Sequence, residues 1–307
     1  MIRQDVAEIR TLIARHKRWD VIFGLIGLLC LAIGLLTFVT LFVDMLIDGH
    51  SRLRPEFFTE FPSRRAGQAG ILSAWIGTTM VMLVTALVAV PLGVAAGIYL
   101  EEYAPSNWVT HIIEINISNL AGVPSIVYGL LALGLFVYQF GLGQSVATVG
   151  LTLALLILPV VIVATREAIR AIPSAIREAA YALGATKWQV VQGHILPYST
   201  GGILTGVIIG MARAIGETAP IITVGALTFI AFLPPSPVGM EFPFLSFEWL
   251  KSPFTVMPIQ IFNWTSRPDP AFQANAAAAG FVLVFMTLAM NGLAIWLRYR
   301  IRRNIKW

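Results

Sequence analysis

Long apolar segments dominate this chain and limit what it can fold into. Six are long enough to cross a bilayer as helices, at about residues 21–43, 73–100, 112–140, 146–165, 199–232 and 276–297. A hydrocarbon core about 30 Å thick needs ~20 apolar residues in a helix, and backbone in lipid must satisfy its own hydrogen bonds. Because 57% of the residues are hydrophobic and only 12% are charged, we expect an all-α integral membrane protein with six transmembrane helices.

The first apolar segment is longer than the core of a cleavable leader. Its 23 residues, 21–43, exceed the roughly 7–15 apolar residues of a secretory signal, so we expect a retained span. The expected organisation has four parts: a cytoplasmic tail over 1–20, the first transmembrane helix and an external loop over 21–72, a core of five helices over 73–298 with a cytoplasmic loop at about 166–197, and a cytoplasmic tail over 299–307.

Positive charge is divided unevenly between the two sides of these segments. Lys and Arg number five in residues 1–20, four in 166–197 and five in 298–307, whereas the loops on the opposite side carry six together. Cytoplasmic loops carry the excess of Lys and Arg, so we expect both termini and the 166–197 loop in the cytoplasm. The net charge of +5 then reflects topology, and we expect no nucleic-acid partner.

The loop expected outside the membrane, residues 233–274, is rich in proline. Eight prolines fall between residues 234 and 270, and they disfavour a regular helix or sheet because proline fixes φ and lacks a backbone N–H. Trp249 and Trp264 suit a water–lipid boundary. Two interpretations remain open, a cap over the helix bundle and a docking surface for an external partner.

Two charged residues interrupt the fifth apolar segment. Arg213 and Glu217 are spaced i, i+4, so one continuous helix would place both side chains on the same face. An arginine at mid-bilayer costs at least ~2.5–3.5 kcal/mol, and such residues usually face protein or a water-filled path. Either the two form a structural ion pair, or Arg213 attracts an oxyanion through its rigid donor fork while Glu217 keeps that binding weak.

Small residues and proline predict where these helices pack and bend. A ridge at steps of four, which permits close helix packing, consists of Gly202, Gly206, Gly210 and Ala214. In the third segment, Gly122 and Pro124 predict a kink.

The 166–197 loop contains the signals of two short helices that meet at a glycine. Pro173 can open the first helix, and Gly184 is suited to end it. Thr186 with Gln189 matches a capping box for the second helix, and Pro197 is expected to limit that helix. From these signals alone, the loop is either a hairpin packed on the bundle or a docking element.

One motif in this loop resembles the EAA loop of ABC importer permeases. The residues that carry the resemblance are Glu178-Ala179-Ala180, Gly184 and the later Leu196-Pro197. The family's loop fits a cleft on a cytosolic ATPase, so the resemblance implies that Glu178, Ala179, Ala180 and Gly184 dock an ATPase subunit. The sequence departs from the family at His194, where Ile is frequent.

Three further motifs are similar to the PstA-type permease subunits of phosphate ABC importers. They are Arg213-Ala-Ile-Gly-Glu217-Thr-Ala-Pro220, Asn119-Leu-Ala-Gly-Val-Pro-Ser-Ile-Val-Tyr-Gly129, and Phe254–Trp264 with Ser266-Arg267-Pro268. The resemblance runs from about residue 70 to the end. It implies the type I ABC importer (MetI-like) permease fold in a bacterial inner membrane, with Arg213 and Glu217 on the path of inorganic phosphate.

The resemblance also implies partners. A homologous PstC-type permease would complete the pore, two PstB-type ATPases would bind below, and a PstS-type phosphate-binding protein would deliver the substrate. This chain has no Gly-x-x-x-x-Gly-Lys-Ser/Thr loop, so it is expected to be a transport subunit and no enzyme, without a cofactor or metal of its own.

Two other functions stay open. The chain could serve another oxyanion, sulfate or molybdate, since an Arg–Glu pair does not distinguish these. It could also be an ATP-independent anion channel or a secondary carrier; inverted repeats would favour a carrier, and none is evident.

Overall fold

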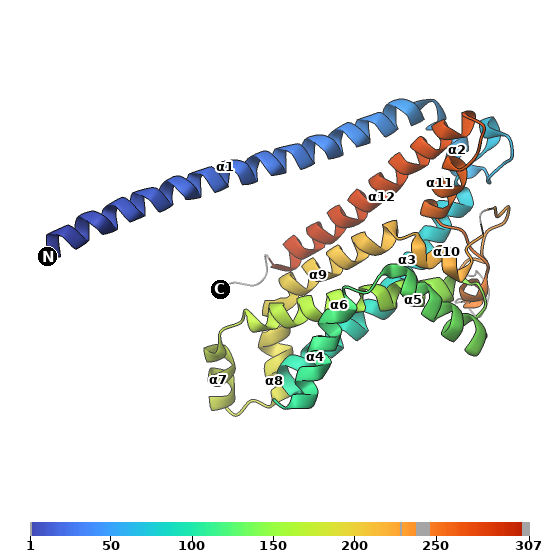
Figure 1. Ribbon diagram of the computed structural model, residues 1–307. Coiled ribbons are helices and arrows are strands. Elements are labelled where there is room, and N and C mark those ends of the chain that lie inside the picture. Colours follow the sequence, from blue (N-terminus) through green and yellow to red (C-terminus); the bar gives the residue numbers. More distant parts are fainter. Residues whose placement is uncertain (1, 228, 238–245, 303–307) are drawn as a thin grey trace.

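The computed structural model describes residues 2–227, 229–237 and 246–302, and these residues contain helices but no strand (Figure 1). The long helices are α1 (Ile2–Gly49), α3 (Leu72–Ile98), α6 (Val146–Arg170), α9 (Leu196–Gly216) and α12 (Ala271–Arg302). The shorter ones are α2 (Pro55–Thr59), α4 (Trp108–Leu120), α5 (Ser125–Ala132), α7 (Ser174–Ala182), α8 (Lys187–Val190), α10 (Ala219–Val224) and α11 (Met257–Thr265).

Brief helical turns of other types join these elements. Three π-helical turns are η3 (Tyr99–Tyr103), η4 (Leu133–Gln139) and η5 (Val191–Ile195), and three 3-10 turns are η1 (His50–Arg52), η2 (Ala66–Gln68) and η6 (Glu248–Lys251). Figure 1 places α7 and α8 at one end of the bundle, the hairpin end, and α10 and α11 at the other, the α10 end.

The six expected spans occur as five continuous helical stretches and one broken pair. The continuous stretches within the described chain are His16–Arg52, Leu72–Tyr103, Val146–Arg170, Lys187–Gly216 and Ala271–Arg300. The third span is bent by 104° between Trp108–Leu120 and Ser125–Gln139, so the predicted kink is confirmed. The prediction of an all-helical membrane fold is confirmed.

The fifth expected span, 199–232, is wrong in its second half. Helix α9 ends at Gly216, and Glu217 has an extended backbone with φ −71° and ψ 132°. A separate helix, α10, then runs only to Val224, where Gly225 adopts φ 93°. Proline lacks the N–H that an interior helical position requires, and Pro220 accordingly lies in the first turn of α10.

Pro197 does not limit the preceding helix as expected. Helix α8 continues through η5 into α9, with Pro197 in the first turn of α9. In η5 the N–H of Leu196 bonds to the carbonyl of Val191, five residues back. The wider π turn lets the chain pass the proline, whose ring would clash in a regular α-helix.

The ridge of small residues on α9 packs closely on another helix, as predicted, and that helix is α6. A Cβ on Gly202 would lie 2.5 Å from the Ala168 Cβ, and one on Gly206 would overlap the Ala164 Cβ. Lipid provides little hydrophobic drive for association, so close backbone approach is what holds such helices together.

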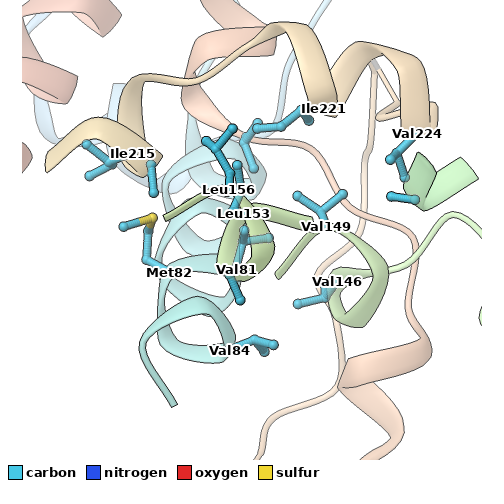
Figure 2. Close-up of a cluster of buried hydrophobic side chains, with 14 of the residues drawn as sticks. Val81, Met82, Val84, Val146, Val149, Leu153, Leu156, Ile215, Ile221 and Val224 are labelled. Carbon is cyan, nitrogen blue, oxygen red and sulfur yellow. The ribbon is translucent and has the colours of Figure 1, made fainter. Parts of the chain in front are cut away.

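Helices α3 and α6 form the centre of the bundle, and α9 and α10 cover part of it (Figure 2). Val81 of α3 and Leu153 of α6 are both 1% exposed. Near the hairpin end, a Cβ on Gly97 would lie 2.6 Å from the Thr165 Cβ, so these two helices are in close contact there as well.

Among the residues of α1 whose side chains are described, those of the final turns pack against the bundle. The Phe42 and Phe281 rings lie 4.8 Å apart, and Gly49 lies directly against the backbone of Ala278 in α12. Toward the N-terminus α1 diverges from α12 (Figure 1), and residues 16–41 are exposed.

The proline-rich loop is more regular than expected. Helix α11 forms there because Pro258 occupies its first turn, where the missing N–H costs nothing. Trp264 of α11 is fully buried and 6.0 Å from the Phe57 ring, so this part of the loop caps the bundle. One of the eight prolines, Pro243, lies outside the described residues.

Candidate functional site

The Arg213–Glu217 pair lies where α9 stops. Arg213 is in the last turn of α9 and Glu217 directly follows the helix; the Arg213 Nε is 3.4 Å from Oε1 of Glu217. The side chains are 38% and 16% exposed, respectively. The ion pair expected from the sequence is therefore present, although Glu217 is not on the same continuous helix.

The backbone favours a positive charge where α9 ends. The carbonyl end of a helix carries partial negative charge, which favours a cation such as Arg213 in its last turn. Within the described chain, the guanidinium meets Glu217 through Nε alone. Its two Nη groups, with the donor geometry that suits oxyanions, make no hydrogen bond to the described residues.

Two of the sequence motifs meet beside this pair. Gly129 of α5 is packed against α10: a Cβ there would lie 2.6 Å from the Pro220 Cα and would overlap Thr223. The hydroxyl of the neighbouring Tyr128 donates to the Leu120 carbonyl of α4 at 2.9 Å. The bend between α4 and α5 thus places α5 against α10, which closely follows the Arg213–Glu217 pair in the chain.

The α7–α8 hairpin, which consists of α7, residues 183–186 and α8, has the caps that were predicted. Gly184 has φ 82°, and its N–H bonds to the Tyr181 carbonyl while that of Ala185 bonds to the Ala180 carbonyl. These two bonds form a Schellman motif, which ends a helix with a residue in the left-handed region. Thr186 and Gln189 form the predicted capping box at the start of α8.

The four residues assigned to docking differ in exposure. Glu178, Ala179 and Gly184 are exposed, and the adjoining Leu183 is 90% exposed. Ala180 is buried in an apolar cluster that holds the hairpin together, with Ile169, Ile172, Val190 and Ile195. A partner could therefore contact Glu178, Ala179 and Gly184 directly, whereas Ala180 positions α7.

A group of ion pairs near the hairpin was not predicted from the sequence. Glu101 accepts from Arg170 at 2.9 Å and lies 3.4 Å from Arg166, which also pairs with Glu114 of α4. Glu102 pairs with Arg177 of α7 at 2.8 Å. A signal existed: the connection at 101–111 has acidic residues but no Lys or Arg, opposite the basic 166–197 loop.

One helical stretch joins the two candidate sites. Lys187–Gly216 begins in the hairpin and ends three residues after Arg213. Its 30 residues correspond to ~45 Å of helix. A continuous helical stretch therefore connects the hairpin with the Arg213 end.

Comparison with known proteins identifies the family. Residues 89–307 match the family described as binding-protein-dependent transport system inner membrane component. The probable ABC transporter permease protein YqgI of Bacillus subtilis (strain 168) is 33% identical over 287 residues, which cover 92% of this chain and 95% of that protein. The phosphate transport system permease protein PstA of Yersinia pestis is 34% identical over 251 residues, covering 81% and 78%.

Solved ABC importers share the fold. A chain of a bacterial ABC transporter involved in the import of the acidic polysaccharide alginate superposes with a TM-score of 0.59 at 15% identity, covering 91% of this chain and 96% of that one. A chain of the MetNI methionine ABC transporter in an inward-facing conformation gives 0.51 at 15% identity, covering 75% and 92%. The chain therefore belongs to the binding-protein-dependent transport system inner membrane components and is a multi-pass permease with the MetI-like fold of ABC importers.

Proposed function

We propose that this chain is a permease subunit of an ATP-driven inorganic phosphate importer. The observation that carries the proposal is its similarity to phosphate transport system permeases, such as PstA of Mycobacterium leprae (strain TN), 34% identical over 230 residues that cover 75% of this chain and 70% of that protein. The partly exposed Arg213 at the end of α9 supports an anion as the substrate.

The Arg213–Glu217 pair suits binding that is weak and reversible. Several carboxylates around the guanidinium would repel an oxyanion. A guanidinium with no carboxylate beside it would bind the oxyanion too firmly to release it. With one carboxylate 3.4 Å from Nε, Arg213 can exchange part of this contact for charge-assisted hydrogen bonds to phosphate oxygens.

ATP hydrolysis takes place on separate subunits in this proposal. The exposed Glu178, Ala179 and Gly184 form the surface that an ATPase contacts, with the hairpin and both termini in the cytoplasm. Two PstB-type ATPases, a PstC-type permease and a PstS-type phosphate-binding protein complete the importer. Movement of the hairpin then passes along Lys187–Gly216 to the Arg213 site.

Uptake of radiolabelled phosphate tests this function. A strain lacking the chain should lose high-affinity uptake, and the wild-type gene should restore it. Unlabelled sulfate or molybdate in excess should leave the restored uptake unchanged. Competition by either anion would favour the alternative of another oxyanion, since the Arg–Glu pair alone does not choose among them.

Purification of the complex addresses the alternative of an ATP-independent channel or secondary carrier. We expect an ATPase subunit to copurify and transport in proteoliposomes to require ATP. Transport that proceeds at the same rate without ATP would contradict the proposed function.

A further inference from the structure

Arg177 ties the α7–α8 hairpin to the end of α3. It donates to the Glu102 carboxylate from Nε at 3.0 Å and from Nη2 at 2.8 Å. It also donates to the backbone carbonyls of Ile169 and Ile172, at 3.0 and 2.9 Å. The Arg177 and Glu102 side chains are 20% and 8% exposed, so the four hydrogen bonds converge where water is largely excluded.

The backbone of η3 presents two neighbouring acids to different helices. Glu101 faces α6, where Arg166 and Arg170 contact it, while Glu102 faces Arg177 of α7. A π turn is wider than an α turn and is frequent at functional positions. Here it places one carboxylate on the bundle and the next on the hairpin.

Carboxylates outnumber guanidinium groups in this cluster. The carboxylates of Glu101, Glu102, Glu114 and Glu167 meet the guanidinium groups of Arg166, Arg170 and Arg177. Every guanidinium already contacts a carboxylate, so no surplus positive charge remains to attract phosphate. This arrangement suits a fixed connection between helices rather than a binding site for the substrate.

Helix α3 can carry a displacement from Glu102 to the opposite end of the bundle. The stretch Leu72–Tyr103 is helical over 32 residues, or ~48 Å. It packs closely on α6 at Gly97, and at the α10 end Thr78 accepts a hydrogen bond from the Met257 N–H of α11 at 2.9 Å.

We propose that Arg177 and Glu102 are positioning residues that transmit hairpin movement to α3 and thereby couple ATP hydrolysis to substrate passage. This inference rests on the proposed function. The hairpin would then be connected to the bundle in two ways. Its chain continues through α8 and η5 into α9, and its Arg177 is joined to α3 through the ion pair with Glu102.

A double-mutant cycle on the purified importer tests the coupling. Glu102→Gln, Arg177→Met and the double variant are reconstituted with the ATPase and the binding protein, and labelled phosphate imported per ATP hydrolysed is measured. We expect each single variant to assemble and hydrolyse ATP but to import about tenfold less phosphate per ATP, since each leaves one partner of a shielded pair uncompensated. The double variant should lose no more than the worse single variant.

Two comparisons keep the result interpretable. Arg65→Met removes an exposed arginine outside the hairpin and should leave the ratio unchanged. Glu102→Gln preserves side-chain shape, so it carries the test if Arg177→Met does not assemble. Wild-type stoichiometry in Glu102→Gln, or losses that add in the double variant, would overturn the inference. A wild-type complex that imports no phosphate would instead contradict the proposed function.

Discussion

The arginines near the two ends of the Lys187–Gly216 stretch are paired with carboxylates in different ways. At the α10 end, Arg213 meets one carboxylate at 3.4 Å, and its side chain is 38% exposed. At the hairpin end, Arg166 is 7% exposed and pairs with both Glu101 and Glu114. A loosely paired, accessible guanidinium can exchange partners with a passing anion, whereas a doubly paired and shielded one holds helices in place.

The largest expected effect comes from removing the loosely held charge. Arg213→Gln should lower phosphate uptake by ~100-fold or more, because charge-assisted hydrogen bonds to the anion are lost. The complex should still assemble, as judged by copurification of the ATPase, since Arg213 makes one long contact within the described chain. Uptake near the wild-type level would remove Arg213 from the substrate path.

The second largest effect is expected from disturbing the close packing of α9 on α6, midway between the two ends. Gly206→Ala places a Cβ in direct overlap with the Ala164 Cβ, and such overpacking costs about 1–3 kcal/mol. Gly201→Ala on the same helix is the matched control, because nothing lies within 4 Å of its Cβ position. Thermal unfolding of the purified complex should separate the two variants; equal midpoints would show that α9 does not depend on this contact with α6.

The elbow, which is the turn at Gly184 between α7 and α8, should weaken the hairpin when it is strained, without affecting Arg213. Gly184→Ala forces a Cβ into the left-handed region at φ 82°, at a cost of about 1–2 kcal/mol. We expect less substrate-stimulated ATP hydrolysis, with Gly184→Asn milder because Asn tolerates this region.

Gly193→Ala serves as the control for the elbow, since this glycine has no positive φ and open space around its Cβ position. Normal stimulation of ATP hydrolysis in Gly184→Ala would count against a docking role for the elbow.

The smallest effect concerns the cap of α8. Thr186→Ala removes the side-chain acceptor for the Gln189 N–H, now at 3.3 Å, and loss of an N-cap costs about 1 kcal/mol. Amide hydrogen exchange over Lys187–Val190 should accelerate by roughly fivefold. Thr79→Ala, at an exposed position within α3, is the control and should leave the exchange rate over Lys187–Val190 unchanged. An unchanged exchange rate in Thr186→Ala would show that the capping box does not stabilise α8.

How much of the two ends could be predicted from the sequence depends on the range of the interactions. The caps at Gly184 and Thr186 are local, because their partners lie within a few residues, and both were predicted. The pairing of Glu102 with Arg177 spans 75 residues, so it depends on tertiary packing that an isolated pattern does not reveal.

The end of α9 at Gly216 was not predicted, because it also depends on contacts between residues far apart in the sequence. The apolar residues after Glu217 are typical of a continuing span. Pro220 is the one local residue type that indicates a break in the helix. Contact between α10 and Gly129 of α5 requires the bend at Pro124, so two distant breaks in the sequence support each other in space.

Cysteine labelling tests most directly whether Arg213 lies on the path of the anion. In a Cys30→Ser background, Arg213→Cys would react with a positively charged methanethiosulfonate while the reconstituted complex turns over. Our account predicts that the thiol is modified, that phosphate slows the modification, and that the restored positive charge recovers part of the uptake. A thiol that stays unreactive in every state of the cycle would contradict it.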